Sequence, residues 1–176
     1  LSVLGISWFW FFGAMFVTQF PNLSKNVLLA DEHVVTLLLV VFSIGIGAGS
    51  LLCERLSGHK IEIGLVPFGS IGLTLFGVDL YFASQSLPGG ALVSTWTLFS
   101  GPYLRVVADL FLMGAFGGFY IVPLYALVQM RSDPAHRSRI IAGNNILNAA
   151  FIVPAAPLAI ALFAAGAAAA AWETLT

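Results

Sequence analysis

Charged residues are scarce in this chain, and their scarcity excludes an ordinary soluble domain. Asp, Glu, Lys and Arg make up 9% of the 176 residues, whereas a soluble domain carries about 25%. Hydrophobic residues make up 59% of the chain, and its mean hydropathy is +0.97. A chain of this composition cannot cover its own surface with polar groups, so the sequence predicts an integral membrane protein whose first partner is the lipid bilayer.

The sequence also lacks the patterns that carry most protein chemistry. Its single cysteine, Cys53, excludes an intramolecular disulfide, and burial at a helix end is the favoured interpretation of that thiol. The net charge is −1 and no basic cluster is present, so no nucleic-acid partner is expected. No metal-ligand spacing, phosphate-binding glycine loop or nucleophile motif occurs. We therefore expect no enzyme activity, no cofactor and no metal in this chain.

Long apolar runs are the main feature of the sequence. A helix needs about 20 apolar residues to cross the hydrocarbon core of a bilayer. Five stretches meet this requirement, at about Leu4–Leu23, Val34–Cys53, Ile63–Phe82, Tyr103–Met130 and Ile141–Trp172. The expected fold class is therefore all-α, a polytopic membrane bundle of about five transmembrane helices.

The positions of Lys and Arg predict how these helices are oriented, because cytoplasmic loops carry an excess of both. Five of the seven lie in the turns after the second and fourth runs: Arg55, Lys60, Arg131, Arg137 and Arg139. The other two, Lys25 and Arg105, fall on the opposite side. We expect both basic turns, and the N-terminus of the chain, in the cytoplasm.

Small residues and prolines interrupt the apolar runs. Gly114 and Gly118 stand four apart and share one helix face, which lets a neighbouring backbone approach closely. The second run contains a further glycine series, Gly45, Gly47 and Gly49. Tight packing and sliding contacts are both open interpretations. Prolines lack a backbone donor, so we expect bends at Pro123, Pro154 and Pro157.

Uncharged polar residues within the apolar runs are candidates for a substrate cavity, because such groups are costly inside a membrane. These residues are Gln19, Asn22, Asn144, Asn145 and Asn148. Asn144 and Asn148 are four apart and share a helix face. Hydrogen bonding between helices is an equally open interpretation, since amides also hold membrane helices together.

Three charged residues lie within the third and fourth runs. Arg105 and Asp109 are spaced to face each other on one helix, and Asp79 can reach Arg105 from the neighbouring helix. A structural charge clamp is the favoured interpretation, because buried charges persist mainly as pairs. Proton coupling through Asp79 or Asp109 is the alternative.

The end of the second run resembles the cytoplasmic loop of the major facilitator superfamily. That pattern combines a glycine, an acidic residue, a basic residue, a second glycine and two more basic residues. It corresponds here to Gly49, Glu54, Arg55, Gly58, His59 and Lys60. The resemblance implies a gating loop in which the acid and the basic residues help to lock one access state.

Three further segments resemble the lysophospholipid transporter branch of this superfamily: 60–67 (KIEIGLVP), 117–124 (GGFYIVPL) and 142–148 (AGNNILN). The resemblance implies that residues 1–176 form part of the C-terminal six-helix half, without its last helix. It implies inward transport of lysophosphatidylethanolamine-type lipids across the bacterial inner (plasma) membrane, with the N-terminal transporter half as a partner. Some relatives are fused to an acyltransferase, which is therefore a further expected partner.

Two other functions are compatible with the sequence. One is a proton-coupled exporter of small solutes or drugs from the same superfamily. The other is a membrane platform that transports nothing and localises an attached acyltransferase.

Overall fold

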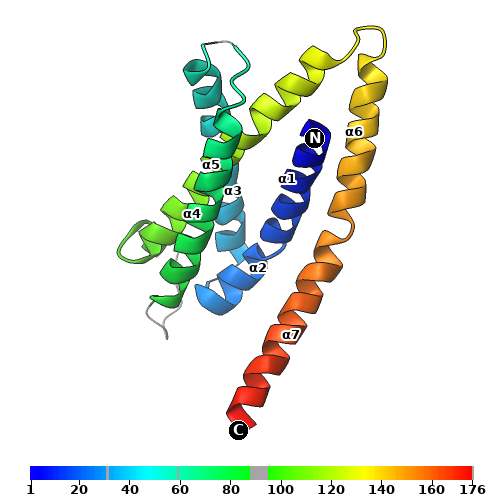
Figure 1. Cartoon of the computed structure of the whole chain (residues 1–176). Coiled ribbons are helices and arrows are strands. Elements are labelled where there is room, and N and C mark those ends of the chain that lie inside the picture. Colours follow the sequence, from blue (N-terminus) through cyan, green and yellow to red (C-terminus); the bar gives the residue numbers. More distant parts are fainter. Residues whose placement is uncertain (31, 59, 88–94, 176) are drawn as a thin grey trace. The chain divides into compact units, whose positions relative to one another are not determined.

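The described part of the chain folds into helices without a strand. The computed structural model describes residues 1–30, 32–58, 60–87 and 95–175. The long helices (Figure 1) are α1 (Ser2–Val17), α3 (Glu32–Leu56), α4 (Leu65–Gln85), α5 (Tyr103–Arg131), α6 (Arg137–Ile152) and α7 (Ala155–Leu175). The short elements are α2 (Phe20–Asn22), the π-helix η1 (Leu23–Val27) and the 3₁₀-helix η2 (Thr97–Phe99).

Five helical segments are long and apolar enough to cross a membrane, as the sequence predicts. They are Ser2–Val27, His33–Leu56, Leu65–Gln85, Tyr103–Arg131 and Arg137–Gly166. The last of these segments includes all of α6 and part of α7. The all-α fold class and the number of candidate spans are therefore confirmed by length and composition.

The chain forms two compact units. Unit 1 contains Val3–Thr18 and Ser132–Thr176, and therefore α1, α6 and α7. Unit 2 contains Gln19–Arg131. In unit 2, α5 is the central helix, and both α3 and α4 pack along it (Figure 1). Most of the buried residues of unit 2 belong to α5, which makes this helix its core.

Glycines set the spacing between α3 and α5. A Cβ atom added to Gly118 would lie 2.6 Å from the backbone nitrogen of Ser50, and one added to Gly114 would meet the backbone of Phe42. On the α3 side, Gly45 and Gly49 face the backbone of Phe111 and Ala115. The two backbones are therefore in direct contact, which is the close approach that the spacing of Gly114 and Gly118 predicts.

Gly47 does not take part in this contact. A Cβ atom added to Gly47 would have no described atom within 4 Å, and the residue is exposed. Two residues along an α-helix turn it by about 200°. Because Gly45 and Gly49 face α5, Gly47 points away from it.

The same contacts give the directions of the helices in unit 2. Residue numbers rise together along α3 and α5, since Gly45 faces Phe111 and Gly49 faces Ala115, so these two helices are parallel. Residue numbers along α4 run opposite to those along α5, since Gly69 faces the backbone of Tyr120 and Gly77 faces Met113, so these two helices are antiparallel. The ends of α3 and α5 that carry Arg55 and Arg131 therefore lie at the same end of unit 2.

Proline ends α6 but not α5. The fifth candidate span is divided between Ile152, the last residue of α6, and Ala155, the first of α7, with Pro154 in the gap. Pro157 lies in the first turn of α7, where a missing N–H costs little. The bend expected in this span is therefore found as a break at Pro154. α5 continues through Pro123.

Candidate functional site

Two asparagines of α6 form a buried polar face in unit 1. Asn144 and Asn148 are 3% and 6% exposed, one helical turn apart. Asn145 is exposed and does not join them. The Ser7 hydroxyl on α1 donates to Asn148 Oδ1 at 2.8 Å, so a side-chain hydrogen bond joins α1 to α6. Sequence reasoning missed Ser7, because a lone serine between Ile6 and Trp8 carries no pattern.

The side-chain oxygen of Asn144 is a hydrogen-bond acceptor for which the described residues offer no donor. Its Oδ1 atom is buried and has no hydrogen-bond partner among the described residues. Leaving a buried acceptor unpaired costs about 1–3 kcal/mol. This oxygen can therefore accept a hydrogen bond from a bound polar group at little further cost.

An apolar cavity lies beside these asparagines in unit 1. It has a volume of about 280 Å³ and is lined by Trp8, Phe11, Ala150, Phe151 and Pro154. Phe11 lies four residues after Ser7 and Phe151 three residues after Asn148, so on each helix a residue that lines the cavity shares a face with one that forms the hydrogen bond. Unit 1 thus places amide groups next to a hydrocarbon-lined space, an arrangement suited to a molecule with a polar head and an apolar tail.

Gln19 and Asn22 belong to unit 2, whereas the asparagines of α6 belong to unit 1. Gln19 is the residue before α2, and Asn22 is the last residue of α2. Asn22 Oδ1 accepts a hydrogen bond from Asn26 Nδ2 at 2.6 Å. The five predicted cavity residues are therefore shared between the two units, and Asn145 is exposed.

The predicted gating loop begins at the end of α3. Glu54 and Arg55 lie in the last turn of that helix and are exposed. Gly58 has φ +57°, a left-handed conformation that glycine adopts without strain and that commonly follows a helix end. Gly49 lies within α3, at its contact with α5, and not in the loop. His59 lies outside the described residues.

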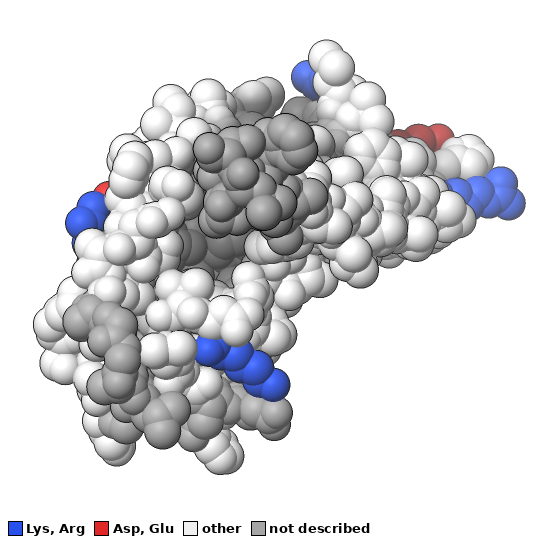
Figure 2. Space-filling view, turned by 90° about the horizontal axis from the view of Figure 1, so that it is seen from below, with Lys and Arg blue, Asp and Glu red and all other residues white. Residues whose placement is uncertain are grey.

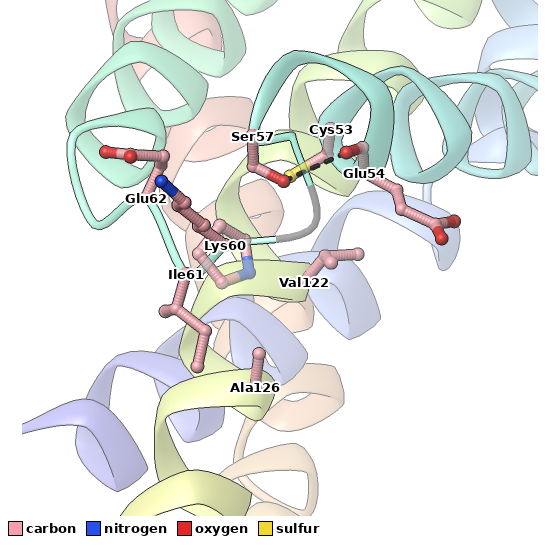
Figure 3. A pocket seen from close by; sticks show the side chains of 9 residues that line it. Cys53, Glu54, Ser57, Lys60, Ile61, Glu62, Val122 and Ala126 are labelled. Atoms are coloured by element: carbon pink, nitrogen blue, oxygen red, sulfur yellow. Dashed lines mark hydrogen bonds between the residues drawn. The ribbon is translucent and has the colours of Figure 1, made fainter.

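A second cavity lies under this loop, with a volume of about 240 Å³. Cys53, Glu54 and Ser57 line it from the end of α3, Lys60 to Glu62 from the loop, and Val122, Pro123 and Ala126 from α5 (Figure 3). The carboxylates of Glu54 and Glu62 point in opposite directions in Figure 3. Cys53 is 2% exposed, as expected for a thiol buried at a helix end.

The charged residues of α4 and α5 form the contact that the sequence predicts. Arg105 Nε donates to Asp79 Oδ2 at 3.0 Å, and the Arg105 Nη2 atom contacts Asp79 Oδ1. This two-point pair joins α4 to α5. Asp109, one turn after Arg105, is 3% exposed. The Oδ2 atom of Asp109 is buried and has no hydrogen-bond partner among the described residues.

Asp133 organises the turn between α5 and α6, which sequence reasoning did not single out. Its Oδ1 atom accepts the Ala135 N–H at 3.0 Å, and its Oδ2 atom lies 3.0 Å from His136 Nδ1. These two contacts, the one with His136 first, lower the pKa of Asp133 below its ordinary value. An Asp directly before a proline at a helix start is the sequence signal for such a turn.

Charge is sparse on the described surface. On the face seen in Figure 2, Lys, Arg, Asp and Glu appear in only a few places, and most of the described surface carries neither sign of charge. Among the residues that the structure describes, no three His, Cys, Asp or Glu side chains gather where they could hold a metal ion.

Comparisons with known proteins found no relative of this chain. The chain matches no family model, no curated protein and no solved structure.

Proposed function

We propose that this chain is the membrane-embedded part of a secondary transporter that moves lysophospholipid across the bacterial inner membrane by alternating access. In this proposal, residues 1–176 supply five helices of the C-terminal half of a major facilitator fold. The N-terminal half of that fold is the partner that completes the pathway, and an acyltransferase is a further partner.

The observation that carries the proposal is the pairing of buried amides with an apolar cavity in unit 1. A lysolipid headgroup cannot cross hydrocarbon cheaply, because burying each unpaired polar group costs about 2–7 kcal/mol. Asn144 and Asn148 offer the headgroup hydrogen bonds, and the cavity of about 280 Å³ lined by Trp8 and Phe151 accepts part of the acyl chain. This combination favours an amphipathic substrate over a wholly polar one.

The contact between α3 and α5, and the loop that follows α3, support the conformational change that alternating access requires. Backbone contacts at Gly49 and Gly118 hold the two helices close without bulky side chains between them. Helices packed this closely can slide along each other, or the pair can rock together as one layer. The loop that follows α3 carries Lys60 and Glu62 beside a cavity, where charges can pair in one access state and separate in the other.

The test is uptake of lysophosphatidylethanolamine by spheroplasts that express the intact transporter containing this chain. Asn144→Leu and Asn148→Leu remove the buried amides, so we expect uptake to fall at least about tenfold, the effect of losing roughly one buried hydrogen bond to a charged group. Asn145→Leu is the matched control, because Asn145 is exposed, and it should transport like the wild type.

Equal uptake by all three variants and the wild type would contradict a role for this polar face. A membrane platform for an acyltransferase predicts that result. Inhibition of uptake by small cationic drugs, with no competition from other lysolipids, would instead support a drug exporter.

A further inference from the structure

The two buried asparagines of α6 differ in what their side-chain oxygens contact. Asn148 Oδ1 accepts the Ser7 hydroxyl at 2.8 Å. Asn144 Oδ1 is buried, and the described residues supply no donor to it. Asn144 is 3% exposed, so bulk water does not take the place of that donor. An acceptor kept from both protein donors and bulk water is suited to a ligand group that donates a hydrogen bond.

Three features of different chemistry follow one another along one face of α6. Arg137, Asn144 and Phe151 stand seven residues apart in this continuous helix. Seven residues make almost two helical turns, so each step along the face drifts by only about 20° and rises by about 10 Å. The face therefore presents a cation, then the open acceptor, then Phe151 on the wall of the apolar cavity.

A lysophospholipid carries three matching groups in the same order. Its phosphate is joined to one glycerol carbon, the next carbon bears the hydroxyl left by the missing acyl chain, and the last bears the remaining chain. Aligned along this face, the phosphate lies toward Arg137, the hydroxyl lies at Asn144, and the chain enters the cavity. A phospholipid with both acyl chains has no hydroxyl at the middle carbon and offers no donor there.

A headgroup ammonium is a less suitable donor for Asn144. A buried cation needs an opposite charge nearby, and the sequence of α6 contains no acid. The helix begins instead with Arg137 and Arg139, which repel a further cation. A hydroxyl is neutral, so the neutral amide oxygen of Asn144 satisfies it without a counter-charge.

We propose that Asn144 recognises the free glycerol hydroxyl of a lysophospholipid and thereby distinguishes lysolipids from lipids that lack this donor. Its Oδ1 atom accepts the hydrogen bond of the hydroxyl, while the cavity beside Phe151 holds the first part of the acyl chain. Asn144 determines specificity, whereas Asn148 holds α6 to α1 through Ser7. This inference rests on the proposed function and adds which part of the substrate the site recognises.

The experiment compares the uptake of two lipids by spheroplasts that express the intact transporter containing this chain. One is lysophosphatidylethanolamine, and the other is its deoxy analogue, in which a hydrogen atom replaces the glycerol hydroxyl. Initial rates at low lipid concentration give the ratio of the two kcat/KM values. We expect the wild type to take up the analogue at least about fivefold more slowly, the effect of losing one hydrogen bond between neutral groups.

Two substitutions separate recognition of the hydroxyl from support of the fold. Asn144→Leu removes the acceptor, so both lipids should be taken up slowly and at rates within about twofold of each other. Asn148→Leu is the matched control, because its oxygen is already bonded to Ser7. This variant should slow both lipids by the same factor and keep the preference of the wild type. Far-UV circular dichroism of both variants checks that their helices remain.

Equal uptake of the two lipids by the wild type would overturn the inference without any variant. Asn144→Leu could instead keep the full preference and lose a difference between ethanolamine and choline headgroups, which would assign the donor to the ammonium and overturn the inference. Loss of the preference in Asn148→Leu would overturn it as well. A wild type that takes up neither lipid contradicts the proposed function itself, and the inference fails with it.

Discussion

At the scale of single residues, polar side chains form the specific contacts that join neighbouring apolar helices. Ser7 and Asn148 join α1 to α6, and Arg105 joins α5 to Asp79 of α4. The second contact follows from the sequence, because charges within apolar runs have few possible partners. The first does not, because its two residues stand 141 positions apart and a serine is common in any helix.

Asp133 gives a residue-scale prediction about pH. Its pKa is lowered by hydrogen bonds from His136 and from the Ala135 N–H, so the folded chain binds this proton less readily than the unfolded chain does. The contribution of Asp133 to stability is then complete above the ordinary Asp pKa of about 3.9 and is lost as the pH falls through the lowered value.

The measurement is the difference in unfolding between the wild type and Asp133→Asn in detergent micelles, followed as the pH is lowered. We expect the two curves to differ at neutral pH and to converge on acidification. A difference that grows as the pH falls would contradict the contacts described for this turn.

At the scale of elements, the packing of α3 against α5 depends on four glycines. The spacing of Gly114 and Gly118 is enough to predict a close helix contact, since it repeats with the turn of the helix. The spacing does not predict which face of α3 packs against α5, because Gly45, Gly47 and Gly49 cannot all point the same way. Which of them face α5 is decided by the rotation of α3 in the folded bundle. For the same reason the sequence does not reveal that Asn145 is exposed.

Glycine substitutions test this interface. In Gly49→Ala and Gly118→Ala the added methyl group meets backbone atoms that cannot move aside, so we expect losses of about 1–3 kcal/mol in the free energy of unfolding, the usual cost of overpacking. Gly47→Ala is the control, because it places its methyl group in open space. Alanine favours helix by about 1 kcal/mol over glycine, so this variant should be neutral or slightly more stable.

Denaturation of the chain in mixed micelles, followed by circular dichroism, measures these differences. Equal stability of Gly47→Ala and Gly49→Ala would contradict backbone contact between α3 and α5.

At the scale of the whole molecule, hydropathy and charge distribution predict five spans and two basic turns on one side. The structure agrees on the number of candidate spans. It also places the ends of α3 and α5 at one end of unit 2, since these helices are parallel. Which side of a membrane this end faces follows only from the excess of Lys and Arg, five against two.

The most direct test of this account is labelling by a membrane-impermeant maleimide in intact spheroplasts. A background without the native thiol, Cys53→Ala, receives one new cysteine at a time. Ser57→Cys and Ser138→Cys mark the basic turns, and Asn26→Cys and Ser86→Cys mark the opposite ends of the helices. We predict that the first two react only after permeabilisation, whereas the last two react in intact spheroplasts. Reaction of Ser57→Cys and Ser138→Cys from opposite sides of the membrane, or of both from outside, would contradict the account.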